Sequence, residues 1–419
     1  MFRNLIVALA ALTFVVSASA KDGGIVEGMS MLRLKALGEQ IRAEVKNGRL
    51  PGAVIMVSRN GKLVYSDVIG AQDPKSNAPM RKDSIFRIYS MTKPIVSVAV
   101  MMLVEEGRLA LTDPISKYIP ELKGLKVGVE KTDASGANTL ELVPATREMT
   151  VQDLLRHTSG LTYGVFGKSL VKDEYTKVGV DSWDQTNAEV MQKLAKVPLQ
   201  FQPGTVWEYS RSVDVLGHLL ERISGQSLDK HLEERVLRPL KMKDTGFWVQ
   251  PAKQDRVAEA FEVDPDTKAK VDLIDVRRPP KLLSGGGGGV STAGDYLRFT
   301  QMLLNGGELD GVRLLSGKTI QYMMSDQLGA MRASSVQRGA AYLPGPGYGF
   351  GLGFAVRMET GEAGNAGTPG ESNWGGLGGT AFWVDPKEKL AVVWMAQGPG
   401  QRAYFRQVLR NRIYGAMVN

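Results

Sequence analysis

The order of hydrophobic and polar positions predicts a helix followed by two strands at the start of the chain. Apolar residues recur at helical spacing between Ser30 and Lys46, and the helix is expected to stop at Asn47-Gly48. Two short apolar runs follow, at Ala53 to Ser58 and at Leu63 to Ile69. The Asn60-Gly61 pair between them is typical of a tight hairpin turn, so the two strands are expected to pair.

The middle of the chain is predicted to be mostly helical, and the C-terminal end returns to strands. Helices are expected at Val151 to His157, Asn187 to Ala195, Val213 to Ser224 and Ser227 to Val236, within a helical lobe from about Pro94 to Arg235. Strands at Ala381 to Val384 and Leu390 to Met395 precede a helix from Ala403 to Tyr414. A polar insert between Lys123 and Ala145 is expected to be a mobile loop, and Gly361 to Ser372 to be irregular. The pattern predicts an α+β fold in which both termini complete one sheet, with a pocket between sheet and helical lobe.

The first twenty residues have the pattern of a cleavable signal peptide. Arg3 precedes an almost wholly apolar run from Leu5 to Val16, and the small residues Ala18-Ser19-Ala20 follow. A membrane anchor is the weaker interpretation, because the run is too short to cross a bilayer comfortably. We expect cleavage after Ala20, a single domain over residues 21–419, no stable membrane insertion after cleavage, and a periplasmic or secreted location.

The composition argues against several other classes of protein. The chain has no cysteine, so it contains neither disulfides nor an N-terminal cysteine that could carry a lipid. A net charge of +8 is mild for 419 residues and comes without a basic cluster, so nucleic-acid binding is not expected. The three histidines, His157, His218 and His231, are too scattered for a metal site, and no metal or cofactor is expected.

The stretch from Phe86 to Pro94 is the strongest candidate for chemistry. It contains Ser90 and Lys93, which three-residue spacing places on one face of a helix, and the apolar run Ile95 to Val104 follows directly. That run has the pattern of a helix buried on nearly all sides. A serine beside an amine at the start of a helix, where unpaired N–H groups favour negative charge, describes an activated nucleophile with a place for an oxyanion.

The Ser-x-x-Lys spacing by itself is weak, because it occurs three times in the chain. Ser169-Leu170-Val171-Lys172 lies in a polar stretch that is predicted to be a surface loop. Ser227-Leu228-Asp229-Lys230 opens a predicted helix, where Ser227 is better explained as an N-cap. Ser90 is the one match that precedes a long buried helix, and this context selects it.

Two further segments could complete a site around Ser90. Tyr209 is expected on a loop that follows the Pro203-Gly204 turn and enters the next helix near Val213, from which its hydroxyl could point into a cleft as a partner base. Glycines allow the backbone to approach a substrate closely, and they gather at Gly285 to Gly289 and at Trp374 to Gly379. The first stretch lacks the lysine of a phosphate-binding loop, so nucleotide binding is not expected.

Five segments, in the same order along the chain, carry a family resemblance. They are Phe86 to Pro94, Leu109 to Pro120, Thr150 to Leu161, Pro203 to Ser210 and Gly285 to Phe299. They resemble the serine β-lactamase and penicillin-binding-protein superfamily, specifically its class C β-lactamase-like branch of family VIII carboxylesterases. The resemblance implies a β-lactamase/transpeptidase-like fold: an antiparallel sheet flanked by helices, with the mostly helical lobe inserted.

The same resemblance implies roles for individual residues. Ser90 would be the nucleophile that accepts the acyl group, and Lys93 with Tyr209 would be its coupled base. The oxyanion hole would use the N–H groups of Ser90 and Leu377, which follows Trp374-Gly375-Gly376. His157 would hold the turn after its helix rather than take part in catalysis.

Two departures from the β-lactamase pattern favour esters over β-lactams. The Tyr-x-Asn motif is Tyr209-Ser210-Arg211 here, so the amide that would contact a lactam side chain is missing. Trp374-Gly375-Gly376 stands in place of Lys-Thr-Gly, and Lys318-Thr319 is a chance match in a helix-like stretch. Loss of that lysine and threonine removes the usual partners of a β-lactam carboxylate, and an aromatic residue there favours neutral, apolar esters.

The sequence therefore predicts an exported serine hydrolase, a carboxylesterase that acts on small-molecule esters through a Ser90 acyl-enzyme. One alternative is a β-lactamase or D-Ala peptidase acting on β-lactam-like substrates or peptidoglycan peptides. Another is a member that keeps the fold and binds a ligand without catalysis, against which the intact Ser90, Lys93 and Tyr209 argue. The oligomeric state and the natural substrate stay open.

Overall fold

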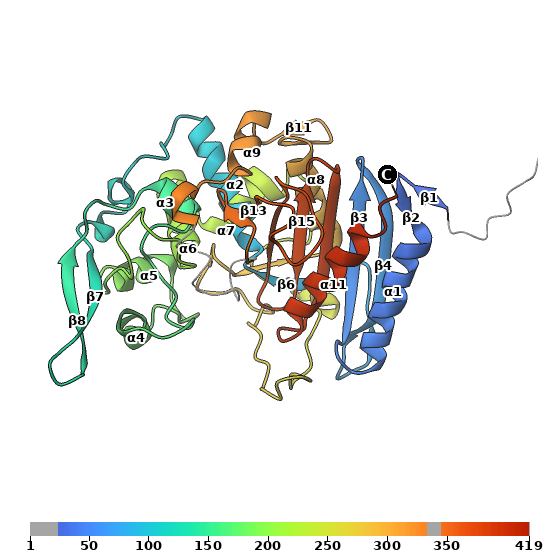
Figure 1. Cartoon of the computed structure of the whole chain (residues 1–419), viewed down its shortest axis with the longest axis horizontal. Coiled ribbons are helices and arrows are strands. Elements are labelled where there is room, and N and C mark those ends of the chain that lie inside the picture. Colours follow the sequence, from blue (N-terminus) through green and yellow to red (C-terminus); the bar gives the residue numbers. More distant parts are fainter. Residues whose placement is uncertain (1–23, 333–344, 419) are drawn as a thin grey trace, which may run out of the picture.

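The centre of the structure is an eight-stranded antiparallel sheet to which both ends of the chain contribute (Figure 1). The computed structural model describes residues 24–332 and 345–418, so the predicted signal peptide lies outside the described residues. In spatial order the strands are β12 (Tyr348–Phe350), β13 (Ala355–Arg357), β14 (Ser372–Gly375), β15 (Ala381–Asp385), β16 (Leu390–Ala396), β3 (Gly52–Arg59), β4 (Lys62–Asp73) and β5 (Ala78–Pro79). The C-terminal β16 pairs with the N-terminal β3 over their full lengths, which confirms the sheet predicted from sequence.

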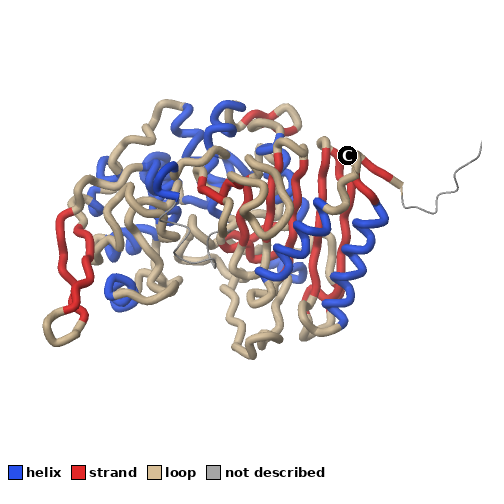
Figure 2. Tube along the Cα trace, viewed as in Figure 1, coloured by secondary structure: helices blue, strands red, loops and turns tan. Residues whose placement is uncertain are grey.

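Alternation along the strands divides their side chains between two layers. On β3, Ala53, Ile55 and Val57 face one way and pack with α1 (Met31–Lys46) and α11 (Arg402–Tyr414). Val54 and Met56 face the other way, toward the larger core under α8 (Ala293–Leu304) and the helical lobe. Figures 1 and 2 show α1 and α11 side by side over the first face, and the helices of the lobe beyond the opposite end of the sheet.

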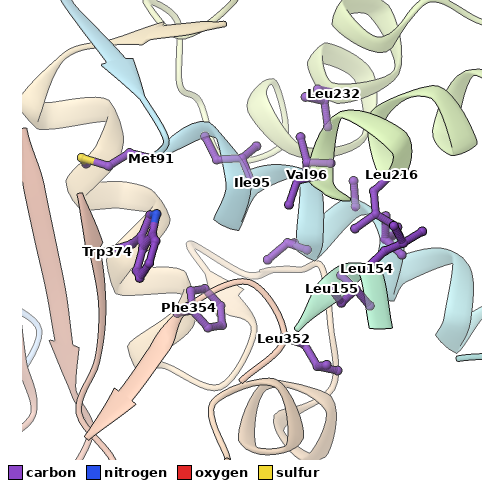
Figure 3. Close-up of a cluster of buried hydrophobic side chains, with 14 of the residues drawn as sticks. Met91, Ile95, Val96, Leu154, Leu155, Leu216, Leu232, Leu352, Phe354 and Trp374 are labelled. Atoms are coloured by element: carbon purple, nitrogen blue, oxygen red, sulfur yellow. The ribbon is translucent and has the colours of Figure 1, made fainter. Parts of the chain in front are cut away.

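The helical lobe is built around α2 (Thr92–Glu105). The other helices of this region are α3 (Val151–Leu155), α4 (Leu170–Lys177), α5 (Asn187–Leu194), α6 (Ser212–Ser224) and α7 (Leu228–Leu232), which continues as a π-helical turn over Glu233–Leu237. Every residue of α2 from Thr92 to Leu103 is buried, as its uninterrupted apolar sequence predicts. Ile95 and Val96 of α2 contribute to a cluster with Leu154, Leu155, Leu216 and Leu232 from the neighbouring helices (Figure 3). This packing fixes α2, and with it the segment that precedes it.

Two predictions about the helical lobe were wrong. The polar insert between Lys123 and Ala145 is not a loop but a hairpin of β7 (Lys126–Thr132) and β8 (Asn138–Pro144), which projects from the lobe in Figure 1. Its alternating apolar residues pack on α4. This alternation indicates strands, but the polar residues of the turn led us to predict a loop. Ser169 is not in a surface loop either, because it caps α4 by accepting a hydrogen bond from the Lys172 N–H.

Shorter elements complete the described part of the chain. They are β1 (Ile25–Val26), β2 (Met29–Ser30), β10 (Glu308–Leu309), β11 (Val312–Arg313) and α9 (Gly317–Met323), with 3-10 turns at Ile115–Lys117, Pro120–Leu122, Pro251–Arg256 and Gly329–Met331. Lys318 and Thr319 lie within α9, as expected for a chance match to Lys-Thr-Gly. Among the described residues no helix is both long enough and apolar enough to cross a membrane.

Candidate active site

Ser90 lies on a tight turn between a short strand and the buried helix α2. The strand is β6 (Phe86–Tyr89), which pairs with β9 (Gly289–Ser291). Helix α2 begins at Thr92, so Ser90 precedes the helix rather than occupying its first turn. Tyr89 has a φ of +43°, a left-handed conformation that is uncommon for a residue other than glycine and typical of strained functional turns. This turn sets Ser90 at the wall of the pocket described below.

Lys93 is buried next to Ser90, and three oxygen atoms lie within hydrogen-bonding distance of its amine. Its side chain is 1% exposed. Its Nζ atom lies 3.3 Å from Ser90 Oγ, 3.2 Å from the Tyr163 hydroxyl and 2.5 Å from the Gly286 carbonyl oxygen. As a neutral amine, Lys93 can donate to the Gly286 carbonyl and the Tyr163 hydroxyl while its lone pair faces Ser90 Oγ, and these contacts hold it beside the serine as a base requires.

Tyr209 is the second side chain that contacts Ser90 Oγ. Its hydroxyl is 2.6 Å from Ser90 Oγ, and the Lys93 Nζ atom lies 4.5 Å from the centre of its ring. The ring packs between Trp207, at a centroid distance of 6.0 Å, and Trp374, at 5.4 Å. As predicted, Tyr209 comes from a loop just before α6, and the structure brings Ser90, Lys93 and Tyr209 together.

Tyr163 belongs to the same cluster and was missed in the sequence. It follows the segment Thr150 to Leu161 by two residues, so proximity to a recognised motif was the signal that could have found it. Its hydroxyl contacts the Lys93 amine, and its ring centre lies 5.3 Å from that of Tyr209. Burial raises the pKa of Tyr163 well above its ordinary value, and the negative charge of Asp214 acts in the same direction. Tyr163 therefore stays protonated and can share its hydroxyl with the lysine.

Arg211 supports this cluster from behind instead of entering the pocket. Its guanidinium bonds Asp181 through Nε at 2.8 Å and Nη2 at 2.6 Å, and Asp214 at 3.3 Å. It also lies 5.0 Å from the centre of the Tyr163 ring. Asp214 in turn accepts hydrogen bonds from the Gly286 N–H at 3.1 Å and from a serine hydroxyl beside it. The network thus fixes both Tyr163 and Gly286, two of the three partners of Lys93.

The glycine-rich stretch Gly285 to Gly289 does not act as the sequence suggested. We expected its backbone N–H groups to approach a substrate, but the Gly286 N–H is used by Asp214 and the Gly286 carbonyl faces Lys93. A Cβ atom on Gly286 would come within contact distance of the Asp214 carboxylate, so a side chain would push the two apart. Glycine is required here for close approach of two parts of the protein, not of a substrate.

The Trp374-Gly375-Gly376 segment includes the end of strand β14 and lies beside Ser90. Strand β13 pairs with β14 only at Ser372 and Asn373, so Trp374 and Gly375 run along a free edge of the sheet. A Cβ atom on Gly376 would collide with the Ile88 carbonyl oxygen, a backbone atom two residues before Ser90. Glycine at 376 therefore lets this strand end lie directly against the turn that carries Ser90.

Ser90 and Leu377 both line one pocket, and their backbone N–H groups have no acceptor among the described residues. The pocket has a volume of about 680 Å³, with Phe166, Tyr209 and Trp374 along its wall. Leu377 itself is 41% exposed at the mouth. Free amides on two sides of an accessible pocket are what an oxyanion site needs.

His157 lies behind Tyr209, at the turn that follows α3. Its φ is +59°, its Nδ1 atom is 3.2 Å from Ser210 Oγ, and its carbonyl accepts the Glu208 N–H at 2.9 Å. Burial, and then the positive charge of Lys93, hold the pKa of His157 well below its ordinary value, so the ring is neutral. These contacts agree with the structural role expected for this histidine, which joins its own turn to the loop of Tyr209.

The sheet topology and the Ser-Lys-Tyr cluster place the chain in the serine hydrolase superfamily of β-lactamase/transpeptidase-like fold. The Beta-lactamase family model matches residues 37–414, and the chain belongs to this family. It is 38% identical to protein Rv1367c of Mycobacterium tuberculosis over 85% of this chain and 88% of that protein. It is 33% identical to esterase EstB of Burkholderia gladioli over 86% and 88% of the two chains.

A solved structure gives the same result for the fold. The unliganded simvastatin synthase LovD from Aspergillus terreus superposes with a TM-score of 0.77 at 25% identity, over 91% of this chain and 98% of that one. The β-lactamase/transpeptidase-like fold expected from sequence is therefore confirmed across nearly the whole chain.

Proposed function

We propose that the protein is a carboxylesterase that cleaves its substrate through an acyl-enzyme on Ser90. The observation that carries the proposal is the position of Ser90 Oγ, which lies 2.6 Å from the Tyr209 hydroxyl and 3.3 Å from the Lys93 amine. A serine held between two groups that can exchange a proton fits nucleophilic catalysis. The similarity to esterase EstB supports esters as the substrate class.

In the proposed reaction Ser90 Oγ attacks the ester carbonyl while its proton passes to the coupled pair Lys93 and Tyr209. The carbonyl oxygen becomes an oxyanion at the N–H groups of Ser90 and Leu377. Collapse of this intermediate breaks the ester bond, and the alcohol leaves with a proton from the same pair. Water then attacks the acyl-enzyme and gives a proton to the pair. The bond between the acyl carbon and Ser90 Oγ breaks, the pair returns that proton to Ser90 Oγ, and the carboxylic acid is released.

At two positions beside Ser90 the chain lacks the side chains of the β-lactamase motifs, which supports esters over β-lactams. Trp374 occupies the strand end where a lysine would bind a β-lactam carboxylate, and it packs on Tyr209 and Phe350 instead of leaving a polar surface. Arg211 is engaged with two aspartates behind the site, so no amide from that position reaches the substrate. These two features are the structural counterparts of the two departures from the β-lactamase pattern that the sequence shows.

The test is hydrolysis of short-chain p-nitrophenyl esters by the purified protein and by Ser90→Ala. We expect activity to be lost in Ser90→Ala and a stoichiometric acyl adduct on Ser90 in rapidly quenched wild-type samples, measured by peptide mass spectrometry. Ser227→Ala is the matched control, because Ser227 opens a second Ser-x-x-Lys match and its side chain makes no capping bond. Ester hydrolysis that survives in Ser90→Ala would reject the assignment. A chromogenic cephalosporin and D-Ala peptides, run alongside, test the β-lactamase and peptidase alternatives.

A further inference from the structure

The pocket of Ser90 continues past the free edge of β14 to helix α11, where arginines line it. Arg402, Arg406 and Arg410 all contribute to the wall of the cavity. Their spacing of four residues places them on one face of α11. The nucleophile and a row of three cations thus share one continuous cavity.

The three arginines differ in whether their charge is neutralised. Arg410 is buried against Glu371, with Nη1 2.5 Å from the carboxylate. Arg402 donates to the Pro399 carbonyl at 2.6 Å, and Arg406 donates weakly to the carbonyls of Gly376 and Thr380, at 3.3 and 3.4 Å. Among residues 24–332 and 345–418, neither Arg402 nor Arg406 forms an ion pair.

A bound anion would stabilise Arg406 more than Arg402, because Arg406 is less well solvated. Its Nε atom is shielded from solvent and has no hydrogen-bond partner among the described residues. Burial lowers the pKa of Arg406 to about 10, and the positive charges of Arg402 and Arg410 act in the same direction. A desolvated cation beside two others is costly unless a negative group joins it.

The carboxylates near this end of the pocket are already engaged. Glu371 accepts from Arg410 and from the Tyr414 hydroxyl at 3.1 Å. Asp264 accepts from the Gly400 N–H at 3.1 Å and from the Gln401 side-chain amide. The anion that would neutralise Arg402 and Arg406 therefore has to come from outside these two side chains.

We propose that Arg402 and Arg406 bind a carboxylate carried by the substrate, so that the preferred esters are anionic. This inference rests on the proposed esterase function and specifies its substrate class. Arg406 bonds the carbonyl of Gly376, the residue before Leu377, so the anion site adjoins the strand end that would hold the oxyanion. The lysine missing from the Lys-Thr-Gly position led us to expect neutral esters, and the arginines of α11 replace that positive charge from a different element.

The test compares pairs of esters that differ only in one charge. Mono-4-nitrophenyl glutarate is matched with its terminal amide, which places the carboxylate on the acyl side. 4-Acetoxybenzoate is matched with 4-acetoxybenzamide, which places it on the alcohol side. In at least one pair we expect the wild-type kcat/KM to favour the acid by about tenfold or more, and added salt to reduce the ratio.

The variants to compare are Arg402→Gln, Arg406→Gln and Arg402→Glu, all read as the ratio of acid to amide within one protein. The first two are expected to bring the ratio close to one, and the charge reversal to bring it below one. Arg412→Gln is the matched control, because Arg412 is exposed on α11 and bonds Gln40 away from the pocket. A wild-type ratio near one in both pairs, or a preference that survives in both glutamine variants, would overturn the proposal.

A binding measurement separates this proposal from the proposed reaction. Phenylboronic acid and 4-carboxyphenylboronic acid both bind a reactive serine, and tryptophan fluorescence can report their dissociation constants because Trp374 lines the pocket. If no ester is hydrolysed, the esterase function fails, but the boronic acids still decide the anion site. Tighter binding of the carboxylated acid in the wild type, lost in Arg402→Gln and Arg406→Gln, supports the site, and equal binding refutes it.

Discussion

Replacing Tyr163 by phenylalanine tests whether Lys93 is held by three partners or needs only two. The Tyr163 hydroxyl lies 3.2 Å from the Lys93 amine, and the side chain is buried among aromatic rings. The substitution removes one oxygen atom and leaves the ring packing in place. Lys93 keeps its bonds to Ser90 and to the Gly286 carbonyl, so the change isolates a single interaction.

The expected loss follows from the charge that Lys93 carries during the reaction. A buried hydrogen bond to a neutral group contributes about 0.5–1.5 kcal/mol, and one to a charged group about 1.5–3 kcal/mol. If Lys93 gains a proton as Ser90 attacks, the bond strengthens in the transition state. The difference of about 1–2 kcal/mol corresponds to a fall in kcat of about 5- to 30-fold.

The assay is the pH dependence of kcat and kcat/KM for p-nitrophenyl acetate hydrolysis by wild type and Tyr163→Phe. We expect kcat to fall with little change in KM, and the limb of the profile that reports the Lys93–Tyr209 pair to shift. Tyr175→Phe is the control, because Tyr175 is also buried in the helical lobe but its hydroxyl makes no hydrogen bond to Lys93. Activity of Tyr163→Phe within twofold of wild type at every pH would refute the reasoning.

Three further changes test the surroundings of the site. The lowered pKa of His157 keeps the ring neutral in the native state, whereas the unfolded chain protonates it below a pH of about 6.5. The wild type therefore loses stability as the pH falls. In His157→Asn, urea unfolding should show a free energy of unfolding that depends less on pH, by up to about 1.4 kcal/mol per pH unit. Gly376→Ala should lower the unfolding free energy by about 1–3 kcal/mol and reduce ester hydrolysis, whereas Gly361→Ala, with open space around it, should change neither. Arg211→Asn restores the Tyr-x-Asn motif but removes the ion pairs of Asp181 and Asp214, so it should lower the unfolding free energy by about 3–5 kcal/mol. We expect no gain in cephalosporin turnover. A stable variant with raised turnover would contradict the network described above.

Most of the sheet could be predicted because its signals are local. The Asn60-Gly61 turn joins β3 to β4, and both its residues have the positive φ that such a turn requires. The strands and helix α2 are continuous apolar segments, so the local sequence predicts them without knowledge of their distant contacts. The hairpin of β7 and β8 was missed because its polar turn and exposed strands resemble a loop until α4 packs on them.

The proximity of Ser90 and Lys93 could be predicted for the same reason, and their surroundings could not. Ser90 and Lys93 are three residues apart, whereas Tyr163 lies 70 residues beyond Lys93 along the chain and Gly286 lies 193 beyond it. Their contacts arise only when the helical lobe closes on the sheet. The three-residue spacing rule predicts contacts between side chains of one helix, and no such rule predicts contacts between residues from separate segments of the chain.

Arg211 shows why a missing motif residue is a poor guide to a missing interaction. From the sequence, arginine in place of asparagine after Tyr209 indicates only that an amide is absent. In the structure the arginine turns toward Asp181 and Asp214 and packs on Tyr163, whose hydroxyl then reaches Lys93. Arg211 thus helps to position Tyr163, which is one of the three partners of Lys93. The same reasoning applies to α11, where Arg402 and Arg406 place positive charge in the pocket although the strand beside it ends in Trp374-Gly375-Gly376. Under the proposed function, the reaction at Ser90 would depend on the few residues next to it, and the choice of substrate on the distant segments that supply the surrounding charges.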